Sequence, residues 1–192
     1  DEEEQLHADY EKNFKKYQDI AIPRVTGVKY QIDIFPEKRS VFVKAQMKLV
    51  NNNSVSIDSV HYSTDKDWNQ EIDIPGAVLV YNDEDYGYRI YKLNKPLPAG
   101  DSINVVISAS YCANGFENEV GNTSVLKNGT FLNNFTILPY MGYNANMEIG
   151  EKNLRRKYGL PAKERMAELK EPCGDFCGKN YLSNGRADLV SV

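Results

Sequence analysis

The stretch that decides the fold is "VKYQIDIFPEKRSVFVKAQMKLV", from Val28 to Val50. Apolar residues occupy every second position in both of its halves, and in the second half they alternate with Lys44, Gln46 and Lys48. Such alternation is typical of a half-buried strand, and the polar "PEKR" in the middle is typical of a turn. The stretch therefore predicts an antiparallel hairpin with one face in the core.

Further segments of the same kind follow this hairpin. They are "IDSVHYS" from Ile57, "AVLVYNDEDYGYRIYKL" from Ala77 and "INVVISASYC" from Ile103. Prolines and a glycine in "KPLPAGDS" exclude a helix between the last two segments. Several short strands at near-even spacing predict a mainly β fold, an antiparallel β-sandwich or a pair of saddle-like sheets. We assign this β-domain to residues 21–150.

Helical patterns lie on both sides of the β-domain. Residues 2–18 place one apolar stripe on a helix, so we expect an N-terminal helix within residues 1–20. From Glu151, "EKNLRRKYGLPAKERMAEL" is helical again, with Gly159 as a stop and a second helix from Pro161 to about Leu169. We interpret "KNLRRK" as a solvated helix face, and residues 151–192 as a helical linker.

The composition excludes several classes of protein. The chain has 192 residues and a net charge of −4, and no basic patch suggests nucleic acid as a partner. No run of about 18 apolar residues is present that could span a membrane. The two histidines are too far apart for HExxH, and GxSxG, P-loop and GxGxxG motifs are missing. We expect this chain to be non-catalytic by itself and to hold no cofactor.

The three cysteines do not form a disulfide framework. Cys173 and Cys177 are close enough in "PCGDFCG" for a local bridge, and two free thiols are the alternative. A zinc site there would need two further ligands, and His7 and His61 lie far off in the sequence.

Both ends of the sequence suggest a piece of a longer protein. The chain begins at Asp1 without a methionine, and it ends at "ADLVSV", which is typical of the start of a strand. We therefore expect further domains in the parent protein.

The two most regular strands resemble a known family. "Y-x-(I/L)-x-(I/L)-x-P" is matched from Tyr30 to Pro36, and "L-x-x-G-x-x-(I/V)-x-(I/V)" is matched from Leu97 to Val105. Both patterns are similar to the N-terminal β-domain of the aminopeptidase N-like zinc metallopeptidases. The resemblance covers about residues 25–192 and leaves the N-terminal helix unexplained.

This resemblance implies a division of labour. Zinc, with HExxH and a glutamate ligand, is expected only in a missing downstream domain, while the β-domain lines one wall of a peptide-binding cleft. A polar side chain of the β-domain, usually glutamine, contacts the free amino end of the substrate in this family. The corresponding segment here, "TFLNNFTILPYMGYN", has no glutamine. The resemblance then gives the role to Asn133, to Asn134 or to no residue of this segment, and Tyr143 and Asn144 complete the predicted substrate-binding edge.

A narrower resemblance concerns "NGTFLNN", "LPYMGYN" and "RRKYGLPAKERMAEL", from Asn128 onward. These segments are similar to a bacterial branch in which a peptidase-like region is fused to an ABC-transporter permease. This branch implies a transporter membrane subunit as a partner, and a membrane-associated or extracytoplasmic location. We interpret "NGTFLNNFTILPYMGYNANMEIG" as the last strands of the β-domain. Glu148 within it is expected to be a solvated acid or a helix cap.

A second reading needs no peptidase parent. The chain would then be a free-standing β-sandwich that binds a carbohydrate or a protein partner. Its 13 tyrosines could supply stacking surfaces, although most of them follow strand periods that are typical of a core.

Overall fold

The structure is a computed structural model that describes residues 2–113, 125–127, 129–163 and 189–191. The chain forms two compact units. The helical unit comprises Asp1–Ile20 with Tyr143–Arg186, and the sheet unit comprises Ala21–Gly142 with Ala187–Val192. The predicted mainly β fold with antiparallel sheets, an N-terminal helix and short later helices is confirmed. None of the helices in the described ranges is long and apolar enough to cross a membrane.

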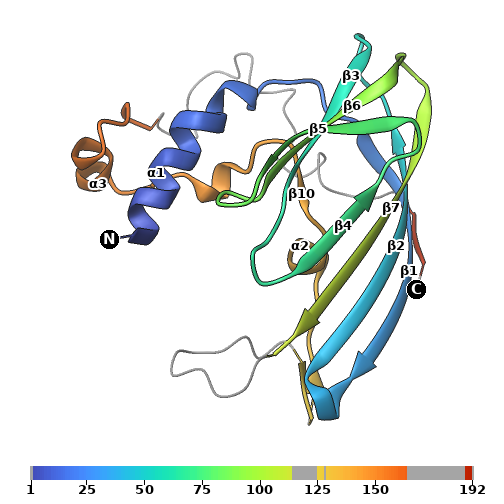
Figure 1. Ribbon diagram of the computed structural model, residues 1–192. Coiled ribbons are helices and arrows are strands. Elements are labelled where there is room, and N and C mark those ends of the chain that lie inside the picture. Colours follow the sequence, from blue (N-terminus) through green and yellow to red (C-terminus); the bar gives the residue numbers. More distant parts are fainter. Residues whose placement is uncertain (1, 114–124, 128, 164–188, 192) are drawn as a thin grey trace, which may run out of the picture. The chain divides into compact units, whose positions relative to one another are not determined.

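The larger sheet of the sheet unit has the strand order β11-β1-β2-β7-β4 (Figure 1). The strands are β1 (Arg24–Phe35), β2 (Ser40–Val50), β4 (Asn69–Asp73), β7 (Ser102–Cys112) and β11 (Leu189–Ser191). The first hairpin is confirmed, since β1 and β2 pair antiparallel around the 3₁₀ turn η2 (Pro36–Lys38) with Tyr30 opposite Ala45. The strand expected at the end of the chain is also confirmed, because β11 pairs parallel with β1.

The smaller sheet has the order β10-β3-β6-β5. Its strands are β3 (Ile57–Ser63), β5 (Ala77–Asp83), β6 (Tyr88–Leu97) and β10 (Tyr140–Met141). A two-stranded ribbon joins β8 (Val125–Leu126) to β9 (Gly129–Thr130). The second predicted hairpin is therefore confirmed as β5–β6.

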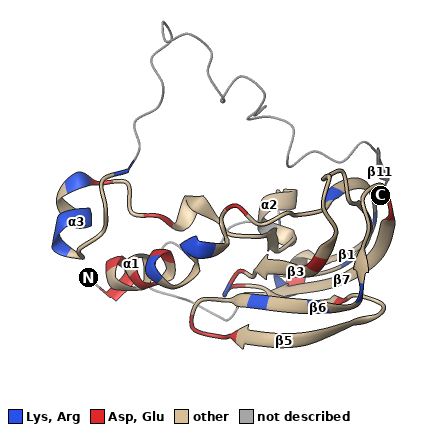
Figure 2. Cartoon of the chain, turned by 90° about the horizontal axis from the view of Figure 1, so that it is seen from above, with Lys and Arg blue, Asp and Glu red and all other residues tan. Residues whose placement is uncertain are grey.

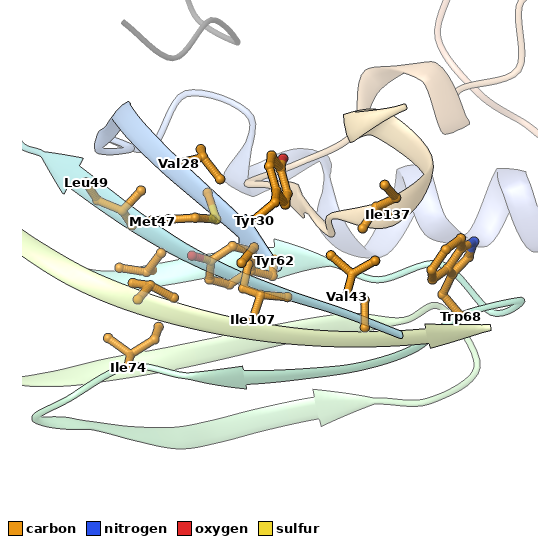
Figure 3. Packing of buried hydrophobic residues seen from close by; sticks show 14 of the residues in the cluster. Val28, Tyr30, Val43, Met47, Leu49, Tyr62, Trp68, Ile74, Ile107 and Ile137 are labelled. Atoms are coloured by element: carbon orange, nitrogen blue, oxygen red, sulfur yellow. The ribbon is translucent and has the colours of Figure 1, made fainter. Parts of the chain in front are cut away.

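The core of the sheet unit draws on both sheets (Figure 3). Alternate residues of β2 are buried, as the sequence predicts, and Val41, Ala45 and Leu49 are completely inaccessible. Tyr62 from β3 and Ile107 from β7 belong to the same cluster. Burial of one large aliphatic side chain contributes roughly 1.5–3 kcal/mol, so this cluster is the main source of stability in the unit.

The helical unit contains α1 (Glu2–Phe14), η1 (Lys15–Tyr17), η3 (Ala145–Met147) and α3 (Lys152–Lys157). Its apolar cluster combines Ala8 from α1 with Ile149 and Leu160. Acidic residues occupy the first turn of α1 and basic residues the last turn of α3, which suits both helix dipoles (Figure 2).

Four sequence interpretations need correction or fall outside the described residues. The segment after β9 forms the helical turn α2 (Asn134–Ile137) before the short β10, where strands were predicted. "KNLRRK" is not a fully solvated face, because Arg155 is buried. Most of the helix predicted from Pro161, and both Cys173 and Cys177, lie outside the described residues.

Candidate functional site

The four residues predicted to bind substrate belong to different units. Asn133 and Asn134 lie in the sheet unit, and Tyr143 and Asn144 lie in the helical unit. Each pair is therefore described within its own unit, and the substrate-binding role of all four stays a prediction.

Asn133 directly precedes the turn α2, and Asn134 is its first residue. The carbonyl of Asn133 accepts from the Ile137 amide at 3.1 Å. Ile137 is buried, and its carbonyl accepts a 2.8 Å hydrogen bond from Nε2 of the buried Gln70. Asparagine is favoured just before a helix, and Pro139 excludes a longer one. The turn is thus anchored by Ile137, while both asparagine residues stay exposed.

A tyrosine from the first hairpin fixes the side chain of Asn134. The Tyr30 hydroxyl donates to Oδ1 of Asn134 over 3.0 Å. Burial raises the pKa of Tyr30 to about 12, so the hydroxyl keeps its proton and acts as the donor at neutral pH. An amide oxygen has two lone pairs, so Oδ1 can accept one further hydrogen bond.

Two phenylalanine side chains next to this asparagine pair in the sequence are exposed to solvent. Phe131 is 75% exposed and Phe135 is 81% exposed, although both are large and apolar. Large apolar side chains gathered at a surface are typical of sites that another protein surface covers. We name residues 131–135 the Asn edge.

Tyr143 is buried in the helical unit. Its ring stacks on Tyr10 with 5.3 Å between centroids, and its hydroxyl donates to Glu148 at 3.1 Å. Burial, together with the neighbouring Glu148 charge, raises the pKa of Tyr143 well above its usual range. Oδ1 of Asn144 accepts from the Asn146 amide at 3.1 Å and thereby caps η3. Both side chains therefore contribute to local structure in this unit.

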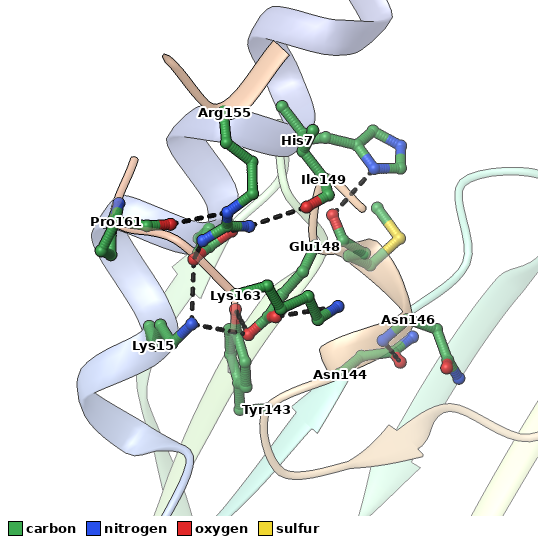
Figure 4. A network of polar contacts seen from close by, with 12 residues as sticks. His7, Lys15, Tyr143, Asn144, Asn146, Glu148, Ile149, Arg155, Pro161 and Lys163 are labelled. Carbon is green, nitrogen blue, oxygen red and sulfur yellow. Dashed lines mark hydrogen bonds and ion pairs between the residues drawn. The ribbon is translucent and has the colours of Figure 1, made fainter. Parts of the chain in front are cut away.

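Glu148 is the centre of a polar network rather than the solvated acid that the sequence suggested (Figure 4). Its side chain is 5% exposed and pairs with Nζ of Lys15 and of Lys163, each at 3.1 Å. Burial by itself would raise the pKa of Glu148, but the hydrogen bonds from both lysines outweigh it and lower the pKa. The segment from Ala145 to Gly150 accordingly consists of the turn η3 followed by Glu148, whose carboxylate has a structural role.

Sequence reasoning missed three further members of this network. Arg155 donates through Nε to the Pro161 carbonyl at 2.7 Å and through Nη1 to the Ile149 carbonyl at 2.7 Å, and it also binds Glu11. His7 is half-buried, with Nδ1 2.8 Å from the Met147 carbonyl oxygen. One indication that Glu11 could be buried was present in the sequence, because Glu11 directly follows Tyr10 of the apolar stripe of α1.

The second histidine lies in the sheet unit. His61 is 4% exposed, with Nδ1 3.0 Å from the Tyr88 hydroxyl and Nε2 3.1 Å from Oγ of Ser59. Burial lowers the pKa of His61 to about 4, so the ring is neutral at pH 7. Within the described ranges, no group of three His, Cys, Asp or Glu side chains could hold a metal ion.

Solved structures similar to this one are M1 zinc metallopeptidases. A two-domain M1 zinc metallopeptidase bound to L-tryptophan has 11% identity and a TM-score of 0.38, over 55% of this chain and 26% of that chain. The M1 zinc metallopeptidase from Deinococcus radiodurans has 11% identity and a TM-score of 0.37, over 52% and 25%. Yeast LTA4 hydrolase in complex with bestatin has 19% identity and a TM-score of 0.31, over 50% and 16%.

The matches thus span about a quarter or less of the length of these structures. No protein-family model matches the chain, and no curated protein matches it.

Proposed function

We propose that this chain is the non-catalytic β-domain of a larger aminopeptidase-like protein and that its Asn edge forms part of a peptide-binding cleft. The observation that carries the proposal is the 3.0 Å hydrogen bond from Tyr30 to Asn134. Tyr30 is the first residue of the strand motif on which the family resemblance rests. The strand that carries the motif therefore positions the side chain of Asn134, which is one of the two asparagines to which the resemblance could give the contact with the substrate.

The chemistry of Asn134 suits the amino end of a peptide. Tyr30 occupies one acceptor position on Oδ1, and the second can accept a hydrogen bond from an ammonium group. The exposure of Phe131 and Phe135 supports a partner surface beside the same edge, and we propose the downstream peptidase-like domain as that partner.

The test uses the full-length parent protein with aminoacyl p-nitroanilide substrates. We expect Asn134→Ala to raise KM about ten- to hundredfold with a smaller change in kcat, because a hydrogen bond to a charged group is lost. Tyr30→Phe should raise KM less, since it removes only the group that orients Asn134. Asn52→Ala changes another exposed asparagine of the sheet unit and should leave KM unchanged.

Two results would contradict the proposal. One is a parent protein without HExxH and without aminopeptidase activity. The other is zinc-dependent hydrolysis of the same substrates by the purified 192-residue chain, which we expect to be inactive with or without added zinc.

A further inference from the structure

The outer face of the larger sheet carries a hollow of about 310 Å³. Its floor is the C-terminal half of β7, where Ser108 and Ser110 present small side chains. Longer side chains from β1 and β2 line one side, and Asn69 and Glu71 from β4 line the other. A row of small residues between two rows of long ones makes a shallow groove along β7, whose place in the sheet is visible in Figure 1.

The pairing register places the polar groups of this groove in two rows. One row runs across the strands through Gln31, Lys44, Ser108 and Glu71. The next runs through Asp33, Phe42, Ser110 and Asn69. Both rows therefore point to the same face, because residues two apart on a strand share a face.

The polar side chains of the groove are available for a ligand. Among the described residues, no hydrogen bond or ion pair engages the side chains of Gln31, Asp33, Lys44, Asn69, Glu71, Ser108 and Ser110. Phe42 adds an apolar surface, since its ring is 50% exposed and Phe35 packs edge-on against it at 6.0 Å. Seven polar groups and one exposed ring thus converge on one open groove.

The chemistry of these groups selects the class of ligand. The lining of the groove includes two carboxylates, Asp33 and Glu71, and one ammonium, Lys44, and this balance of charge disfavours an anion. An extended peptide would gain little, because β7 is already paired on both edges and offers no free backbone edge. The mixture of hydroxyls, amides and charged groups instead matches a ligand whose groups each donate and accept. The C–H face of a sugar ring suits Phe42.

We propose that this groove binds a neutral oligosaccharide, with Phe42 beneath one sugar ring and the two polar rows bound to its hydroxyls. The groove uses no residue of the Asn edge. The proposal is therefore independent of the peptidase-like function and can fail or succeed separately from it.

The experiment titrates the 192-residue chain with neutral trisaccharides (cellotriose, maltotriose, xylotriose and chitotriose) and follows amide shifts by NMR. We expect saturable shifts on β1, β2, β7 and β4 with at least one of these probes. Phe42→Ala should weaken binding about tenfold or more, and Ser108→Arg should abolish it by filling the floor. Tyr81→Ala, which removes an exposed ring from the other sheet, should bind as the unchanged chain does.

The proposal is overturned if none of the four trisaccharides shifts these strands. It is also overturned if Ser108→Arg, shown to be folded by its spectrum, binds as the unchanged chain does. Comparable shifts with inorganic phosphate or with a lysine tripeptide would show that the groove selects charge instead of sugar hydroxyls.

Discussion

The carboxylate of Glu11 accepts two hydrogen bonds from the guanidinium of Arg155, at 2.7 Å from Nη2 and 2.8 Å from Nη1. The two side chains are only 1% and 3% exposed. The pair joins α1 to α3 across more than 140 residues of sequence. It is therefore a buried polar connection between the N-terminal segment and the later segment of the helical unit.

Arg155→Met should destabilise the helical unit by about 3–5 kcal/mol, because it leaves a buried carboxylate without its main partner. Hydrogen exchange of the α1 amides measures this loss as reduced protection. Lys157→Ala is the matched control, since it breaks the exposed ion pair with Glu4 and should leave protection nearly unchanged. An equal loss of protection in both variants would contradict the larger contribution expected from the buried pair.

The buried His61 should make the sheet unit less stable in mild acid. Its pKa is about 4 in the folded chain and about 6.5 in an unfolded chain, so only the unfolded state binds a proton between these values. The stability is complete above pH 6.5 and falls as the pH decreases towards 4, by up to about 3 kcal/mol.

Fluorescence of Trp68 can follow this loss, because it is the single tryptophan and lies in the core of the sheet unit. Urea unfolding should give a smaller decrease in stability between pH 6.5 and 5 for His61→Gln than for the unchanged chain. If the stability of both proteins decreased equally, titratable groups other than His61 would be the cause of the pH dependence.

Two fully buried tyrosines should respond to phenylalanine in opposite ways. Among the described residues the hydroxyl of Tyr62 has no hydrogen-bond partner, whereas that of Tyr88 contacts Nδ1 of His61. Tyr62→Phe should raise the free energy of unfolding by about 1 kcal/mol, and Tyr88→Phe should lower it by a similar amount. Urea unfolding followed by Trp68 fluorescence compares the two, and a loss of stability in Tyr62→Phe would reveal a missed partner.

Gly87 and Gly100 both adopt a positive φ, but their surroundings differ. A Cβ at Gly87 would lie 2.5 Å from the Thr64 carbonyl oxygen, and one at Gly100 would meet nothing within 4 Å. Gly100→Ala should cost about 1–2 kcal/mol from backbone strain alone. Gly87→Ala should cost about 1–3 kcal/mol more because Thr64 must move. Equal midpoints of urea unfolding would contradict this difference.

Much of the sheet unit was predictable, because alternation with period two records locally which face of a strand is buried. Val41 to Leu49 illustrate this, since every residue predicted to point inward is buried. The N-terminal helix was predictable for the same reason from its own period. Local sequence could not predict α2, because "NNFTILP" suits a strand or a turn. The burial of Ile137 and its hydrogen bond from Gln70, 67 residues earlier, decide the outcome.

The candidate site likewise has features that the sequence predicts and features that only the tertiary structure shows. The sequence by itself determined in which segments apolar and polar residues alternate. This alternation determined the hairpins and the inward or outward direction of their side chains. Only the tertiary structure decided that Tyr30 holds Asn134, that Arg155 meets Glu11, and that the outer residues of β1, β2, β7 and β4 line one groove. The reason is physical, because burial of a charge and the pairing of strands depend on residues that are distant in sequence.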